Sequence, residues 1–347
     1  MRLFKAKHCR ARRNGMISKS SLVQLSLLFV AAVFVIAIAP FVGMDIISPD
    51  KLFKDELQTT IFFSLRVPRV LAAFLAGSGL ALCGMVFQAM FRNPLADPFT
   101  LGISSGASCG AAAVILSGIN GAILGIPYIS LGAFIGAALS MACVYSLSSL
   151  RRASSGITML LAGIAISFLF SSILMFMQYV SSLRDSFHIV RWLMGGIEVI
   201  GYQQIFSMVP FLACGIIILI FKLPELDHLL VGDDLAKSRG VRVSLTKNLL
   251  LLAATLIVGS IVAVCGPIGF VGLMTPHICR MFFKTRHTIL GPATFLFGGI
   301  FLVLCDMLAR VVIAPAEMPV GVITALLGGP FFLWLLFIKK ARGVGLD

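Results

Sequence analysis

The chain has 347 residues; 59% are hydrophobic, 12% are charged, and the formal net charge at pH 7 is +14. A mean hydropathy of +1.03 indicates an integral membrane protein and excludes an ordinary soluble domain. Since about 20 apolar residues cross the hydrocarbon core, the length allows about ten spans and no soluble catalytic domain.

The amino end combines basic residues from Arg2 to Lys19 with an apolar run over Leu22–Val42. This run is too long for a typical signal peptide and has no clear small-x-small cleavage site, so we predict an uncleaved first span. The positive charge is better explained by membrane topology than by nucleic-acid binding. Residues 1–20 are thus a predicted basic cytoplasmic tail, and 21–347 a single transmembrane domain.

Apolar runs separated by polar or helix-breaking residues predict an all-α protein with ten transmembrane helices. In chain order these lie near Leu22–Val42, Val67–Phe91, Gly102–Ile119, Ile129–Leu150, Ile157–Val180, Ile205–Phe221, Leu249–Val264, Val271–Phe283, Ala293–Ile313 and Pro319–Ile338. The stretch Leu249–Phe283 is short for two crossings, and GPIGF within it predicts a bend that protein or a cavity must cover.

The basic residues support this count of spans. With the amino end inside, most of the 28 Lys and Arg residues lie on the cytoplasmic side. Those assigned to the outer side are Lys51, Lys54, Arg66, Arg69, Arg184, Arg191 and Arg310. Because positive residues collect in cytoplasmic loops, this bias predicts that both termini are cytoplasmic.

Small residues recur at helical spacing in several spans. Gly102, Gly106 and Gly110 form one row, and Gly132 with Gly136 forms another. Such rows let helix backbones approach closely inside a membrane. We favour packing within one bundle, with a seam between two subunits as the alternative.

Polar and basic residues occupy Lys222–Asn248, a cytoplasmic loop of the predicted domain with apolar runs on both sides. The hydrocarbon core does not accept these charges, so the segment must lie at a membrane face. Within it, Asp233 is a predicted N-cap, and Gly240 is placed to end a short helix. A capped helix on the cytoplasmic face is a site that another protein can bind and displace.

Six sequence blocks resemble the FecCD-type permeases, the membrane subunits of ABC importers for iron–siderophores, haem and cobalamin. The blocks are RVPRVLAAFLAGSGLALCGMVFQAMFRNPLADPFTLGISSGAS (Arg66–Ser108), LLAGIAIS (Leu160–Ser167), RWLMGGI (Arg191–Ile197), AKSRGVRV (Ala236–Val243), GPIGFVGLMTPHICR (Gly266–Arg280) and EMPVGVITALLGGPFFLWLL (Glu317–Leu336). They occur in the family's order, and together they cover nearly all of the chain from about residue 22 to residue 342.

The resemblance implies a type II ABC importer permease fold in a bacterial or archaeal cytoplasmic membrane. It also implies a second permease subunit, two cytoplasmic ABC ATPase subunits and an extracytoplasmic substrate-binding protein as partners. A homodimer is favoured, and a close heterodimer stays open.

The resemblance assigns three groups of residues. ATPase coupling is implied for a helix pair within Leu229–Val241, through Leu229, Leu230, Asp233, Leu235, Ala236, Lys237, Arg239 and Gly240. A cytoplasmic gate is implied for Asn93, Leu95, Ser154 and Ser155, and docking of the binding protein for Arg66, Arg69 and Arg310.

Each assignment has a simpler alternative. The coupling segment can be a solvated basic loop, and Asn93–Leu95 can be an ordinary turn with Asp97 capping the next helix. Arg310 can pair internally with Asp306 one turn earlier. Trp192 resembles part of a short outer helix near the pathway mouth but can also be an interfacial anchor. Glu317 is assigned a structural role at a helix start.

No chemistry is expected in this chain. It lacks GxxxxGK[ST], so ATP is expected to be used by the partner ATPase, and no cofactor is expected to be bound here. There is no HExxH motif or paired-cysteine site, and neither a metal site nor a nucleophile with its base is predicted.

The favoured function is a permease subunit that takes up an iron–siderophore, haem or cobalamin-type chelate by alternating access, driven by a separate ATPase. The alternative is an ion-coupled secondary transporter, which would need acidic residues at the membrane midplane or broken helices that face an ion site. The predicted bend at Gly266–Gly269 is a point in favour of this alternative. A structural scaffold explains neither the gate-like turn nor the capped helix. The sequence does not select among the three cargoes.

Overall fold

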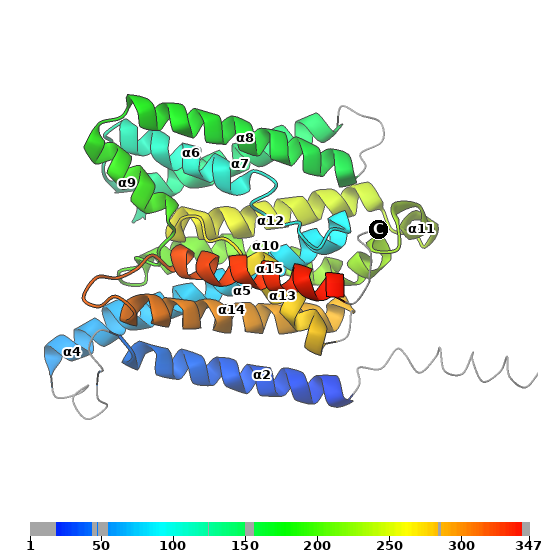
Figure 1. The fold of residues 1–347 in the computed structure, drawn as a ribbon, viewed down its shortest axis with the longest axis horizontal. Helices are drawn as coiled ribbons and strands as arrows, with labels where there is room; N and C mark the ends of the chain where they lie inside the picture. The colour runs from blue at the N-terminus through cyan, green and yellow to red at the C-terminus, as the bar shows by residue number, and fades with distance from the viewer. Residues whose placement is uncertain are drawn as a thin grey trace, which may run out of the picture.

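The computed structural model describes residues 19–43, 47, 55–123, 125–149, 156–283 and 286–341. This part of the chain contains ten apolar helices, one for each predicted span (Figure 1). They are α2 (Lys19–Ile38), α5 (Val67–Phe91), α6 (Ile103–Leu116), α7 (Tyr128–Ser149), α8 (Gly156–Val180), α10 (Gln203–Leu229), α12 (Val243–Cys265), α13 (Val271–Phe282), α14 (His287–Val311) and α15 (Val320–Ala341). The prediction of an all-α membrane protein is confirmed.

These helices differ in length, as the crowded stretch between α12 and α14 requires. In the described residues, seven helical segments are long and apolar enough to cross a membrane. By contrast α13 has 12 residues, and at 1.5 Å per residue it rises about 18 Å against a hydrocarbon core of about 30 Å. The doubt about two full crossings in Leu249–Phe283 therefore resolves into one long helix and one half-length helix.

Short elements lie at the two ends of the bundle. They are η2 (Ala39–Phe41), α4 (Glu56–Ile61), η3 (Phe62–Arg66), α9 (Leu183–Leu193), α11 (Asp233–Ser238) and an antiparallel hairpin of β1 (Ala122–Ile123) and β2 (Ile126–Pro127). Figure 1 places α4 and α9 at one end, and α11 with the last turn of α15 at the other. On the predicted topology, the end with α11 is the cytoplasmic end.

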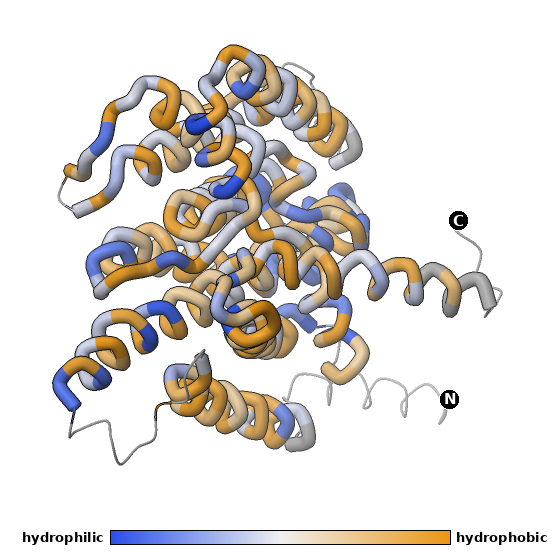
Figure 2. Tube along the Cα trace, turned by 60° about the vertical axis from the view of Figure 1, so that its left-hand side comes forward, coloured by the Kyte–Doolittle hydropathy of each residue, from blue (hydrophilic) through white to orange (hydrophobic). Residues whose placement is uncertain are grey.

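The long helix α5 forms the centre of the bundle. Every residue from Ala76 to Phe91 is buried, because α5 packs against α10, α12, α13 and α14. Figure 1 shows α2 and α8 at the outside of the bundle. They expose large apolar side chains such as Phe34 and Phe168. Figure 2 shows hydrophobic colour along the helical bodies and more hydrophilic colour in the connecting segments. This pattern suits helices surrounded by lipid.

Glycine rows bring α6 and α7 into backbone contact. A Cβ at Gly106 would overlap the carbonyl oxygen of Gly136, and one at Gly110 would overlap that of Gly132. The two rows therefore face each other within one chain, as the favoured interpretation predicted. The physical reason is that van der Waals packing, not hydrophobic burial, holds helices together in lipid.

The GPIGF segment between α12 and α13 is unwound. Gly266 and Phe270 both have positive φ, at 66° and 67°. The backbone after α9 packs against this segment: the N–H of Gly196 donates to the carbonyl oxygen of Cys265 just before it at 2.8 Å, and Gly195 lies against the carbonyl oxygen of Pro267. The predicted bend is thus present, and protein lies against it.

Candidate functional site

The polar segment at the cytoplasmic end contains one short helix, α11. The prediction of a helix pair within Leu229–Val241 is wrong, because α10 runs without a break through Lys222 and ends at Leu229. The remaining connection to α12 contains only α11 as regular structure. Gly240, with φ of 85°, follows the end of α11 as predicted, and its N–H donates to the carbonyl oxygen of Lys237 at 2.9 Å.

Asp233 is the first residue of α11, and not its N-cap as predicted. The N-cap is Gly232, which makes no side-chain cap bond. The carboxylate of Asp233 instead lies 2.6 Å from Nζ of Lys247 on α12 and 3.3 Å from a guanidinium nitrogen of Arg92 at the end of α5. The local sequence favoured an N-cap at Asp233, but its carboxylate instead pairs with Arg92 and Lys247, which are distant in the sequence.

Burial divides the predicted coupling residues into two sets. Leu229 and Ala236 are 0% exposed, so they attach the segment to the bundle and cannot contact a partner in this structure. Leu230 and Leu235 are 40% and 51% exposed. The exposed cations beside them form weak local pairs: Lys237 with Asp234 at 3.1 Å, and Arg239 with the ring of His228 at 3.3 Å. An apolar centre surrounded by exposed charges of both signs is therefore available to a partner.

The predicted gate turn lies directly after α5. Arg92 ends the helix in the left-handed conformation, with φ of 53°. The side-chain oxygen of Asn93 then accepts a hydrogen bond from the N–H of Leu95 at 2.9 Å, and the Leu95 side chain is 57% exposed. Asn93 thus builds the turn that presents Leu95. Ser154 and Ser155, the other predicted gate residues, lie outside the described residues.

Asp97 does not cap the next helix, which is the alternative considered for this turn. The N-cap of α6 is Gly102. The carboxylate of Asp97 is buried in the connection between α5 and α6, where it accepts a hydrogen bond from the N–H of Phe99 at 3.0 Å. Burial raises the pKa of this carboxyl from 3.8 to about 6.

At the opposite end, Arg310 is an internal residue. It is 3% exposed, lies 3.2 Å from Asp306 and donates to the backbone oxygens of Val42 and Ala39. The assignment of Arg310 to docking is therefore wrong for this structure, and its alternative as an internal partner of Asp306 is observed. A cation inside a span is stabilised only when its charge and its donors are satisfied.

The other two predicted docking arginines also have intramolecular partners. Arg69 donates to Asp306 at 3.0 Å and to Glu317 at 2.6 Å. Arg66 donates to the carbonyl oxygens of Pro40 and Phe41, both at 3.2 Å. Glu317 is therefore held to α5, in keeping with the structural role assigned to it. Its side chain is 48% exposed, so the bond between Arg69 and Glu317 lies at the surface.

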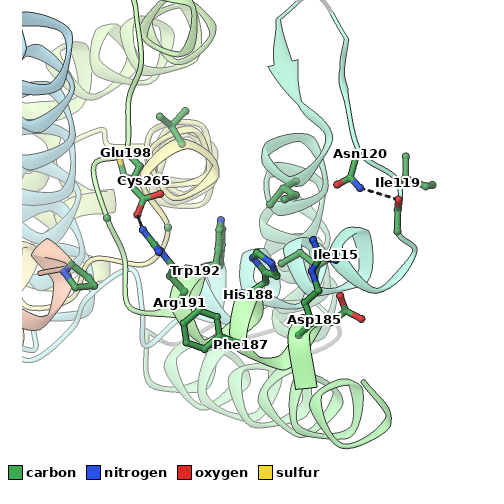
Figure 3. Close-up of a pocket in the computed structure, with 17 residues that line it drawn as sticks. Ile115, Ile119, Asn120, Asp185, Phe187, His188, Arg191, Trp192, Glu198 and Cys265 are labelled. Carbon is green, nitrogen blue, oxygen red and sulfur yellow. Dashed lines mark hydrogen bonds and ion pairs between the residues drawn. The ribbon is translucent and has the colours of Figure 1, made fainter. Parts of the chain in front are cut away.

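A cavity of ≈ 620 Å³ opens beside α9 at this outer end (Figure 3). Trp192 lines it from the end of α9, together with Arg184, Asp185 and His188 from the same helix. Arg191 is held 2.9 Å from Glu198. Ser182 is the N-cap of α9, and its hydroxyl accepts a hydrogen bond from the N–H of Asp185 at 3.2 Å.

Sequence reasoning placed a short outer helix at Trp192 but missed the polar residues of this cavity. The available signal was local: Ser182 followed three residues later by Asp185 is a capping pattern, and it precedes alternating polar and apolar residues. Local sequence patterns do not reveal that Asn120, from the loop before β1, lies across the cavity from α9 (Figure 3).

The family model of the FecCD transport family matches residues 25–338. The chain belongs to the FecCD transport family. It is a membrane-spanning permease subunit of an ABC importer, as the resemblance of the six blocks predicted.

Relatives within the FecCD family cover most of the chain. It is 40% identical over 294 residues to an uncharacterized ABC transporter permease protein, YvrB, of Bacillus subtilis, covering 83% of this chain and 82% of that protein. It is 39% identical over 280 residues to the vitamin B12 import system permease protein BtuC of Salmonella typhi, covering 81% and 84%.

A solved structure supports the type II importer permease fold. It is described as an inward-facing conformation of a transporter assigned to the metal-chelate type of ABC transporters. The TM-score is 0.80 at 32% sequence identity, and the match covers 92% of this chain and 99% of that one.

Proposed function

We propose that this chain imports a bulky chelate, of the iron–siderophore, haem or cobalamin class, by alternating access powered by a separate cytoplasmic ATPase. The observation that carries the proposal is the segment around α11, which exposes Leu230 and Leu235 beside charged side chains. Asp233 joins this segment by ion pairs to the end of α5 and to α12. Since the sequence contains no GxxxxGK[ST] motif, force derived from ATP would enter this FecCD permease from another polypeptide.

In this proposal Leu230 and Leu235 enter a groove on the ATPase, while Lys237 and Arg239 meet acidic side chains around that groove. The buried Leu229 and Ala236 attach the segment to the bundle, and Gly240 ends α11. Asn93 and Leu95 form the cytoplasmic gate, and Ser154 and Ser155 join them from the connection between α7 and α8. Apolar contact in the centre with charge at the rim is the usual anatomy of a protein interface.

A second copy of the chain completes the pathway, with two ATPase subunits inside and a substrate-binding protein outside. Both termini lie in the cytoplasm of a bacterial or archaeal cell. Arg66 and Arg69 receive glutamates of the binding protein, and an incoming carboxylate replaces Glu317 on Arg69. Arginine suits this exchange because its planar fork binds a carboxylate through two hydrogen bonds.

An ion-coupled secondary transporter needs a titrating acid at the membrane midplane or a broken helix that faces an ion site, and the unwound GPIGF segment is a point in its favour. The main carboxylate in a span, Asp306, lies near the outer end of α14 between Arg69 and Arg310. Cations at 3.0 and 3.2 Å pair with this carboxylate, so its observed contacts are those of a structural ion pair and not of an open ion-binding site. This pairing favours the ATP-driven importer over the alternative.

The test is reconstitution of the chain in liposomes with its ATPase and binding protein, using radiolabelled cyanocobalamin, ferrichrome and haemin as cargoes. We expect uptake of one cargo that needs ATP, the ATPase and the binding protein together. Accumulation on a proton or sodium gradient by the chain alone would overturn the proposal. The cargo that is accumulated identifies the substrate class.

A further inference from the structure

Three charged side chains from distant parts of the chain meet at the inner end of the bundle. Asp233 begins α11, Arg92 ends α5, and Lys247 lies in the cytoplasmic end of α12. One carboxylate oxygen of Asp233 lies 2.6 Å from Nζ of Lys247, and the other lies 3.3 Å from the guanidinium of Arg92. A single carboxylate thus joins the exposed helix to two core helices.

The two ion pairs are unequal. The Lys247 side chain is 8% exposed, and its short contact resists exchange because an unpaired buried cation is costly. The Arg92 side chain is 44% exposed and its contact is longer, so solvent screens this pair and it can break and reform. Lys247 is therefore suited to be a fixed point, and Arg92 a movable one.

Arg92 is directly attached to the gate turn. Its backbone ends α5 in the left-handed conformation, and the N–H of Asn93 donates to the carbonyl oxygen of Gln88 at 3.2 Å. Asn93 in turn holds the N–H of Leu95. The guanidinium of Arg92 is connected to the exposed Leu95 side chain through the Arg92 side chain and the backbone of one tight turn, so we expect a displacement of Arg92 to reach the turn that presents Leu95.

There is room for such a movement. A cavity of ≈ 370 Å³ lies between the segment Val231–Leu235, the guanidinium of Arg92 and Gly156 at the start of α8. Side chains that fill a core cannot shift without disturbing their neighbours, whereas this space leaves one side of the ion pair open.

We propose that Asp233 is a positioning residue that transmits the displacement of α11 to the gate turn Asn93–Leu95 through Arg92, with Lys247 as the fixed point. This inference rests on the proposed function, because it assumes that an ATPase pushes α11 and that Leu95 lies in the gate. It adds a physical connection between those two sites that the likeness to other permeases does not supply.

The experiment uses the complete complex of permease, ATPase and binding protein in lipid nanodiscs and liposomes. A Leu95→Cys substitution reports on the gate through its rate of labelling by a water-soluble maleimide, measured above the labelling of the chain with Leu95 intact. The second readout is the amount of radiolabelled cyanocobalamin, ferrichrome or haemin accumulated for each ATP hydrolysed. A side chain that merely stabilises the fold would not change this ratio.

Three variants and one control test the connection. Asp233→Asn removes the carboxylate charge, Arg92→Gln removes the movable partner but keeps the pair with Lys247, and the third variant combines both changes. We expect each single change to reduce the ATP-dependent change in Leu95→Cys labelling by about fivefold or more, and the double change to add nothing further. Asp233→Glu should restore most of the response.

The matched control is Asp234→Asn, which removes the same charge from the next position of α11. The Asp234 side chain is 97% exposed, and its ion pair within the described part of the chain is with the exposed Lys237, so uptake per ATP should equal that of the unmodified complex. If the Asp233→Asn complex fails to assemble, the Arg92→Gln variant tests whether Arg92 transmits the movement, since it leaves the pair between Asp233 and Lys247 in place.

Two results overturn the inference: unmodified coupling in Arg92→Gln, or additive losses in the double variant. A different result addresses the proposed function. If the unmodified complex shows no ATP-dependent uptake of any of the three cargoes, the importer assignment fails. If that complex works and the variants behave like the Asp234→Asn control, only the transmission through Asp233 and Arg92 fails.

Discussion

The two ends of this permease each place one aspartate between two cations, yet the two networks differ in burial. At the outer end Asp306 and Arg310 are buried, and the network also holds the backbone of η2. At the inner end the Asp233 side chain is 25% exposed, and one of its partners is accessible to water. Burial makes the outer network a stable clamp, that is, a fixed connection between α5, α14 and η2, while exposure lets the inner network exchange partners.

The largest expected effect breaks the outer clamp. Asp306→Ala leaves Arg69 and Arg310 facing each other without their shared carboxylate, so we expect a loss of about 3–5 kcal/mol in the free energy of unfolding. Thermal unfolding in detergent and the yield of inserted protein measure this loss. A fully stable Asp306→Ala protein would contradict the view that the outer network is a clamp.

The next test compares neighbouring residues of α11. Ala236→Asp puts a charge at a position that is 0% exposed, so it should destabilise the protein by several kcal/mol, on the order of 3 or more. Leu235→Asp changes an exposed side chain, so stability should shift by about 0.5 kcal/mol or less while ATP-driven uptake is lost. Thermal unfolding and liposome uptake separate the two outcomes. Equal uptake in Leu235→Asp and the unmodified complex would remove Leu235 from the proposed coupling surface.

Asp97 sharpens the comparison, because this inner-end carboxylate is buried with a backbone donor in place of cations. Its pKa is raised to about 6, so its favourable contribution to stability is present below pH 4 and is lost as the pH rises through about 6. Asp97→Asn should therefore gain stability over the unmodified protein only at the higher pH, by roughly 2–3 kcal/mol. Unfolding temperatures of both proteins between pH 4 and pH 8 measure the difference. A gain that is the same at both ends of this range would argue against a buried titrating carboxyl.

The smallest stability effect is expected at the surface of the outer network. Glu317→Gln removes an exposed partner of Arg69 while Asp306 stays in place, so unfolding should change by about 1 kcal/mol or less. Arg66→Glu removes the hydrogen bonds to Pro40 and Phe41, but we expect the protein still to insert and the stimulation of ATP hydrolysis by the binding protein to fall. Hydrolysis rates with and without the binding protein measure this effect, and equal stimulation would leave Arg66 as a structural residue that holds the backbone at Pro40.

Several features were predictable from sequence because they depend on local patterns. Apolar runs located ten helices, and the six blocks identified the family. The GPIGF segment indicated a bend, and Gly240 indicated the end of α11. Each of these follows from neighbouring residues alone: backbone groups must pair within a helix in lipid, and glycine tolerates conformations that other residues avoid.

The assignments that failed involve partners far apart in the chain. Asp233 matched the pattern of an N-cap, but Lys247 and Arg92 lie against its carboxylate. Arg310 matched a docking residue, but Asp306 and the backbone of η2 bury it. Leu229 and Ala236 matched an apolar contact surface, but the bundle covers them. Ser154 and Ser155 lie outside the described residues, so their assignment stays a prediction.

The sequence by itself determined that this is a ten-helix FecCD permease whose polar segment between α10 and α12 lies at a membrane face. These properties follow from the cost of placing charges and unpaired backbone in hydrocarbon, which acts on each segment separately. Only the tertiary structure decided which side chains of that segment face outward and which aspartate joins which helices. Burial and charge pairing depend on residues that are far apart in the sequence and are brought together by folding. A local sequence pattern does not show which of these residues will be in contact.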